Sequence, residues 1–99
     1  MRTFEPTRLQ TVANERLTVL LRRHAQRVLR RGKNQAQMAH DAGLDESYLS
    51  RLLSGERSNP SREAIILLGG WGLELTVEEV DELLLAADYK PLVLPASLR

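Results

Sequence analysis

The fold is decided by residues 34–57, which read Asn-Gln-Ala-Gln-Met-Ala-His-Asp-Ala-Gly-Leu-Asp-Glu-Ser-Tyr-Leu-Ser-Arg-Leu-Leu-Ser-Gly-Glu-Arg. Asn34 is a residue type that caps helices, so a first short helix is expected to follow it. Gly43 supplies the positive φ that a tight turn requires. Asp45 can cap a second short helix, which Ser54-Gly55 ends. The stretch therefore predicts two short helices joined by a glycine turn.

The second of these helices divides by periodicity into two stripes. The inner, apolar stripe consists of Leu49, Leu52 and Leu53. The outer, polar stripe consists of Ser47, Ser50, Arg51 and Ser54. Two helices joined in this way, with a polar stripe on the second, have the geometry of a helix-turn-helix that can enter the DNA major groove. Small serines permit close approach to base edges, and an arginine can bond bidentately to guanine.

Helical spacing continues on both sides of this pair. Upstream, apolar residues from Leu9 to Leu29 recur every three or four positions, which predicts a helix of about 24 residues ended by Gly32. Asn14 is its one candidate for an internal break.

Downstream of the pair, two more helices are expected. The first is opened by Pro60 and carries Trp71, which we expect in the core. Its Gly69-Gly70 pair either permits close helix–helix approach or ends the helix early. The second begins with the capping box formed by Thr76 and Glu79. No alternating strand pattern occurs, so the predicted fold class is all-α.

Charge is distributed unevenly along the 99 residues. The net charge is +1, yet residues 1–31 hold eight arginines against two glutamates, a net +6. Residues 32–62 are neutral, and residues 63–99 hold two basic residues against seven acids, a net −5. A basic end attracts polyanions such as nucleic acid.

The composition excludes several classes of protein. The chain has no cysteine, hence no disulfide or thiolate metal site, which fits a reducing cytoplasm. No apolar run approaches the roughly 20 residues of a membrane span. Arg2, Glu5 and Arg8 interrupt any signal-peptide core, so a cytoplasmic location is expected. A length of 99 residues predicts one small domain.

The chain resembles the lambda-repressor/Cro (Xre) helix-turn-helix family. The resemblance covers about residues 16–88 and rests on Gln35, Ala39, Gly43, Leu44, Leu49, Leu52, Gly55 and Pro60. Two departures stand out, because Leu53 occupies a position where the family usually has an acid, and the first helix is longer than usual. The resemblance implies a lambda-repressor-like five-helix domain with an extended N-terminal helix. Its expected parts are an arm and helix extension (1–15), the domain (16–88, with the helix-turn-helix at 34–54) and an extended tail (89–99).

The resemblance also implies sequence-specific binding to double-stranded DNA by a bacterial or phage transcriptional regulator, such as a repressor, that forms homodimers on two-fold sites. No cofactor is implied. The residues expected to read bases are Glu46, Ser47, Ser50 and Arg51. Gln35 is the expected phosphate clamp at the start of the first short helix, and a capping role alone is its other interpretation. Further phosphate contacts could come from Lys33, Asn34, Ser54 and Arg57.

Some assignments keep two interpretations. Glu46 either accepts a hydrogen bond from a cytosine amino group or is a first-turn charge without a contact. The basic ridge of Arg22-Arg23, Arg27 and Arg30-Arg31 is either a solvated face or a support for phosphate binding.

The function has an alternative too. The acids at 45–46 and the extra N-terminal helix favour a protein-interaction module that reuses the fold, such as an antitoxin or an assembly adaptor. An enzyme is not expected, because a cysteine nucleophile and a glycine-rich phosphate loop are missing. His24 and His40 are expected at solvated or edge positions rather than in a metal site. No membrane contact or small-molecule ligand is indicated.

Overall fold

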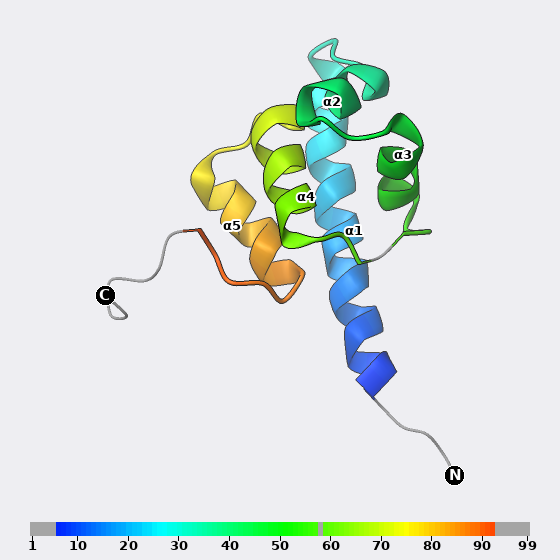
Figure 1. Ribbon diagram of the computed structural model, residues 1–99, viewed down its shortest axis with the longest axis vertical. Helices are drawn as coiled ribbons and strands as arrows, with labels where there is room; N and C mark the ends of the chain where they lie inside the picture. Colours follow the sequence, from blue (N-terminus) through cyan, green and yellow to red (C-terminus); the bar gives the residue numbers. More distant parts are fainter. Residues whose placement is uncertain (1–5, 58, 93–99) are drawn as a thin grey trace.

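The computed structural model of the chain describes residues 6–57 and 59–92, with side chains from Glu15 onward. Within this part of the chain the elements are α-helices and one π-helical turn, without any strand, as Figure 1 shows: α1 (Pro6–Arg30), α2 (Gln35–Ala42), α3 (Glu46–Ser54), α4 (Arg62–Leu67), η1 (Leu68–Gly72) and α5 (Val77–Ala86). The all-α prediction is confirmed. None of the described helices is both long and apolar enough to cross a membrane. The expected arm in residues 1–5 and the end of the tail, from residue 93, lie outside the described residues.

Helix α1 is the scaffold of the domain. It runs unbroken through Asn14, so the candidate break there is not used. Its buried side chains recur at three- or four-residue spacing from Leu17 through Leu21 to Val28. Helices α3 and α5 both pack against α1, on opposite sides of it in the view of Figure 1.

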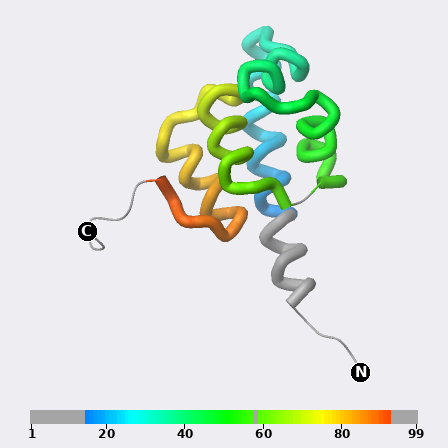
Figure 2. The backbone as a smooth tube through the Cα atoms, in the orientation of Figure 1, coloured from blue at the N-terminus to red at the C-terminus, as the bar shows by residue number. Residues whose placement is uncertain are grey.

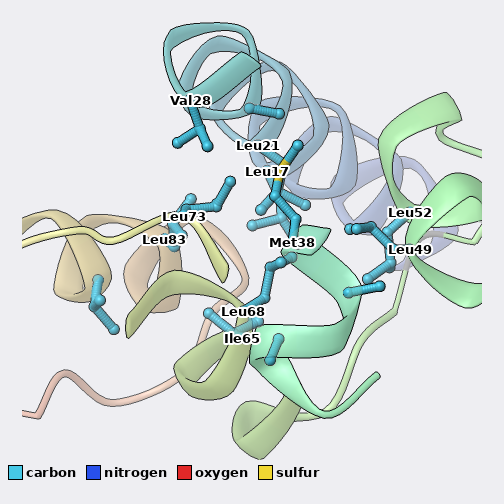
Figure 3. Packing of buried hydrophobic residues seen from close by; sticks show 14 of the residues in the cluster. Leu17, Leu21, Val28, Met38, Leu49, Leu52, Ile65, Leu68, Leu73 and Leu83 are labelled. Carbon is cyan, nitrogen blue, oxygen red and sulfur yellow. The ribbon is translucent and has the colours of Figure 1, made fainter. Parts of the chain in front are cut away.

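The core forms where the inner stripes of the helices converge. Figure 3 shows Leu17 and Leu21 of α1 pointing toward Met38 of α2. Leu49 and Leu52 of α3 extend the cluster on one side, as the inner stripe predicted. Burying one such side chain stabilises the fold by about 1.5–3 kcal/mol. Because each short helix contributes at least one such side chain, the helices hold one another in place.

Local caps define where the short helices begin. At α2, Asn34 Oδ1 accepts a hydrogen bond from Gln37 N (2.8 Å), as predicted. At α5, Thr76 Oγ1 accepts from Glu79 N (3.2 Å), and Thr76 N donates to Glu79 Oε1 (3.1 Å), which completes the predicted capping box. The turn after α2 is made by Gly43 in the left-handed region (φ +70°). These signals are local, so the sequence alone could locate them.

The start of α4 differs from the prediction. The helix begins at Arg62, and its cap is Ser61, whose Oγ accepts a hydrogen bond from Ala64 N (3.1 Å). Pro60 therefore precedes the cap instead of opening the helix. Pro60 is buried, and its carbonyl accepts a hydrogen bond from Tyr89 Oη (2.9 Å), which ties the loop to the end of α5.

The glycines after α4 permit close approach and do not end the helix. The chain winds on as η1, which lies beside α2 (Figure 2). A Cβ atom on Gly72 would lie 2.8 Å from the carbonyl oxygen of Met38, and one on Gly69 would lie 3.0 Å from Val80 Cγ2 of α5. A Cβ atom on Gly70 would meet nothing within 4 Å. Gly69 and Gly72 thus set the distances from η1 to α5 and α2.

Trp71 is not in the core, contrary to the prediction. The residue is 66% exposed, because the inner face of η1 is taken by Leu68 and Gly72. The indole instead borders an apolar groove of about 230 Å³, lined by Ile66, Gly70, Trp71, Leu75, Val77, Val80 and Leu92.

His24 is also placed differently from the expectation. His24 is only 6% exposed. Its neighbour Arg27 forms an ion pair between α1 and α5, with Nη2 at 3.2 Å from Glu79 Oε2. Arg27 Nη2 also donates to His24 Nδ1 (3.1 Å). Burial is the main reason why the pKa of His24 is lowered, and the positive charge of Arg27 lowers it further.

We predict that Gly72→Ala destabilises the domain by about 1–3 kcal/mol, because the added methyl group would press against a backbone oxygen that cannot turn away. The matched control is Gly70→Ala two residues earlier, which should be neutral or stabilise by up to about 1 kcal/mol, since the site is open and alanine favours helices. Urea unfolding of both variants measures the difference. Equal stability of the two variants would contradict the packing of η1 on α2.

We also predict a pH dependence due to His24. In the unfolded chain His24 has the ordinary histidine pKa of about 6.5, whereas its pKa in the folded chain is lower. The contribution of neutral His24 to the stability of the fold is therefore complete above about pH 6.5 and is lost as the pH falls through the folded pKa. The melting temperature should therefore fall between pH 7 and pH 5, and His24→Gln should reduce that fall. His40→Gln, which removes an exposed histidine, is the control and should leave the fall unchanged. The same pH profile in the parent and in His24→Gln would refute this assignment.

Candidate nucleic-acid interface

The polar stripe of α3 faces solvent, as its spacing predicted. Ser47, Ser50 and Arg51 are exposed, while Leu49 and Leu52 of the same helix are buried. The orientation of α3 is thus fixed by its leucines, and the stripe is free to meet a large partner.

The stripe borders an open hollow, which we call the α3 hollow, of about 430 Å³. Its lining residues are Gln35, Glu46, Ser47, Ser50, Arg51 and Glu56. Gln35 comes from the first turn of α2, so the starts of α2 and α3 meet at this surface. The residues predicted to read bases therefore lie together here with the predicted phosphate clamp.

Glu56 is the lining residue that the sequence analysis missed. It follows Gly55, whose left-handed backbone (φ +88°) turns the chain back at the end of α3. The signal was present, since a residue just after a C-terminal glycine returns toward its helix.

The charges in the α3 hollow are mixed. Arg51 brings a positive charge, whereas Glu46 and Glu56 bring negative ones. Phosphate would be repelled by two carboxylates, but a carboxylate can accept a hydrogen bond from a base amino group, and an arginine can donate to guanine. The α3 hollow is therefore better suited to base edges than to phosphate.

The remaining predicted phosphate contacts lie outside the α3 hollow, and most of their polar groups are engaged. The side-chain oxygen of Asn34 caps α2. The hydroxyl of Ser54 donates to Arg51 O (3.1 Å) and accepts from Glu56 N (3.2 Å). The guanidinium of Arg57 is exposed and stands 5.4 Å from the centre of the Tyr48 ring, a cation–π distance.

Lys33 is held inside the domain. Its Nζ pairs with Asp41 (2.8 Å) and Glu74 (3.2 Å) and donates to the carbonyl of Trp71 (3.2 Å). Burial would lower the pKa of Lys33, but the hydrogen bonds to the two carboxylates outweigh it and raise the pKa. With its side chain only 11% exposed, Lys33 links α2 to the end of η1.

We predict that Lys33→Gln destabilises the domain by about 1 kcal/mol, since the two carboxylates lose their shared cation. The control is Lys90→Gln, which removes the only other lysine of the chain, from an exposed position. Thermal unfolding at low and high salt should show a larger loss for Lys33→Gln that shrinks as salt screens the pairs. Indistinguishable melting curves for the two variants would argue against the Lys33 link.

Comparison with known families agrees with this geometry. Residues 24–68 match the family model described as helix-turn-helix, a segment that contains α2, α3 and α4. The match confirms the resemblance to the lambda-repressor/Cro (Xre) family and to its fold, and it identifies a DNA-binding helix-turn-helix domain in this segment. Comparison with curated proteins and with solved structures gives no match.

Proposed function

We propose that this helix-turn-helix domain of the lambda-repressor/Cro (Xre) type binds double-stranded DNA sequence-specifically, with α3 in the major groove, as part of a bacterial or phage transcriptional regulator. One observation carries the proposal: Arg51 and the two serines of the outer stripe line one open surface together with Gln35 at the start of α2. In this arrangement one helix can read the bases while the neighbouring helix binds the DNA backbone.

The roles divide by position. The residues that read base edges lie on the exposed side of α3 and line the α3 hollow; they are Glu46, Ser47, Ser50 and Arg51. Gln35 binds a backbone phosphate at the start of α2, where unpaired helix N–H groups favour an anion. Arg57 adds a phosphate contact from the loop after α3. Asn34 and Ser54 use their side chains as caps and contribute less, and Lys33 is left out because it is already paired.

A homodimer is part of the proposal. A single α3 of nine residues spans about 13.5 Å at 1.5 Å per residue, so it covers only a few base pairs. Two copies related by a two-fold axis would read two half-sites about 34–36 Å apart. Selection of bound oligonucleotides from a random duplex pool tests this directly, and an inverted repeat with that spacing is the expected product.

A protein-interaction module remains the second candidate, and one observation favours it. The groove beside Trp71 exposes apolar surface away from the α3 hollow, and apolar patches of that kind are used for protein contacts. The two candidates differ in salt dependence, since DNA binding weakens steeply as salt rises. If the parent chain bound no duplex at low salt, the interaction module would become the better proposal.

We predict different losses for Arg51 and Gln35. Arg51→Ala should remove about 1–3 kcal/mol at one base pair of each half-site, so that the preference for guanine there is relaxed. Gln35→Ala should weaken the selected and the scrambled duplex about equally, because a phosphate contact carries no sequence information. Titration of both variants on both duplexes separates the roles.

Arg57→Ala is the charge control for this series. If Arg57 meets a phosphate, its loss should reduce the slope of log K against log salt by about one, whereas the neutral Gln35 should leave the slope unchanged. Arg51→Lys keeps the charge but cannot make the bidentate bond, so it should resemble Arg51→Ala in discrimination. Full discrimination by Arg51→Ala would refute the base-reading role.

A further inference from the structure

Helix α3 has no side-chain cap at its start, whereas its end is bonded to another helix. Asp45 occupies the N-cap position, but its side chain makes no capping hydrogen bond. At the other end, the carbonyls of the last turn would have no partners within the helix. The buried leucines orient α3, and the partners of those carbonyls determine where its end lies.

All four terminal carbonyls of α3 have partners. Within the loop, Gly55 N donates to Leu52 O (3.3 Å), and Arg57 N donates to Arg51 O (3.0 Å). The last two carbonyls are satisfied from α1. Arg22 Nε donates to Leu53 O (2.5 Å), and Arg22 Nη2 donates to Ser54 O (2.9 Å).

Three physical features favour the contact between Arg22 and α3. The guanidinium presents a rigid fork that reaches two adjacent carbonyls at once. Its positive charge lies at the negative end of the helix dipole. Gly55 also lies beside α1, since a Cβ atom there would be at ordinary contact distance from Thr18 Cγ2 (3.7 Å) and Arg22 Nη2 (3.8 Å).

We propose that Arg22 is a positioning residue for DNA recognition: it fixes the end of α3 to α1 and so sets how the base-reading stripe enters the groove, without itself contacting DNA. This inference rests on the proposed function for its effect on DNA and on the two hydrogen bonds for its effect on α3. Of the two interpretations of the basic ridge, it assigns Arg22 to neither. Arg22 is exposed, yet its Nε and Nη2 are directed at two carbonyls of α3.

Three variants test the proposal. Arg22→Gln removes the charge and the fork. Arg22→Lys keeps the charge but can reach the two carbonyls only with a single ammonium. Arg23→Gln is the matched control, because it removes the same charge from the next, exposed position of α1.

The first measurement is amide hydrogen exchange, which needs no DNA. In Arg22→Gln, the amides of Gly55 and Arg57 should exchange on the order of tenfold faster, while those in the middle of α5 should change much less. Arg22→Lys should fall between the parent and Arg22→Gln, and Arg23→Gln should match the parent. An equal change at α3 and α5 would mean general destabilisation and would overturn the positioning role, as would no change at either.

The second measurement is binding to the selected and scrambled duplexes over a range of salt concentrations. Arg22→Gln should lower the ratio of the two affinities about tenfold with little change in the salt slope, and Arg22→Lys should restore only part of that ratio. A salt slope reduced by about one with the ratio intact, and full rescue by lysine, would make Arg22 a phosphate contact and overturn the proposal. If the parent bound no duplex, the DNA-binding function would fail, and hydrogen exchange alone would decide whether Arg22 holds α3.

Discussion

The structure depends on the burial of one stripe of α1, from Leu17 to Val28, against the inner faces of the shorter helices. Helices of six to ten residues, such as α2 to α5, are only marginally stable in isolation. The free energy gained from a few helical turns does not offset the free-energy cost of nucleating the helix. The long helix supplies a continuous apolar surface on which the others are held. The helix-turn-helix is thus held in place by α1, although α1 contributes no residue to the α3 hollow.

Polar contacts set the angles of the short helices on this surface. Arg22 secures the end of α3, Arg27 reaches the capping residue Glu79 at the start of α5, and Lys33 ties α2 to the end of η1. In each case a basic side chain meets a helix terminus or a carboxylate beside one. Apolar packing chooses the buried face of each helix, and a directional hydrogen bond to a particular carbonyl or carboxylate further restricts its position. The excess of basic residues in the first third of the chain therefore has an internal role, in addition to any attraction for DNA.

Local signals made much of the fold predictable from the sequence. The caps Asn34 and Thr76 and the turn at Gly43 each depend on a few neighbouring residues, and the inner leucines of α3 follow from periodicity. The same periodicity placed the outer stripe, so the residues that line the α3 hollow were largely predictable; their roles on DNA stay a prediction.

The errors arose where distant parts of the chain meet. Trp71 was expected inside because an aromatic residue in a helical pattern usually is, but the winding of η1 gives the inner position to Gly72, whose contact with Met38 no local pattern reveals. The ion pair of Lys33 with Glu74, far along the chain, has no local signal in the sequence, and the phosphate contact expected of Lys33 stays a prediction. The bonds of Arg22 go to main-chain carbonyls, which every residue carries, so no side-chain pattern could have identified that pairing.

The mixed charge of the α3 hollow has a consequence for how such a domain would discriminate. A surface of arginines alone gains affinity from any DNA, because phosphate is present at every step of the backbone. Glu46 and Glu56 oppose that general attraction at the surface where Arg51 stands. Removing a carboxylate from water costs little free energy where a base amino group can donate a hydrogen bond to it. The cost is larger where only hydrogen-bond acceptors face it. If the domain binds DNA as proposed, the acids would lower non-specific binding more than specific binding. The ratio of these two affinities would then determine recognition among many competing sites.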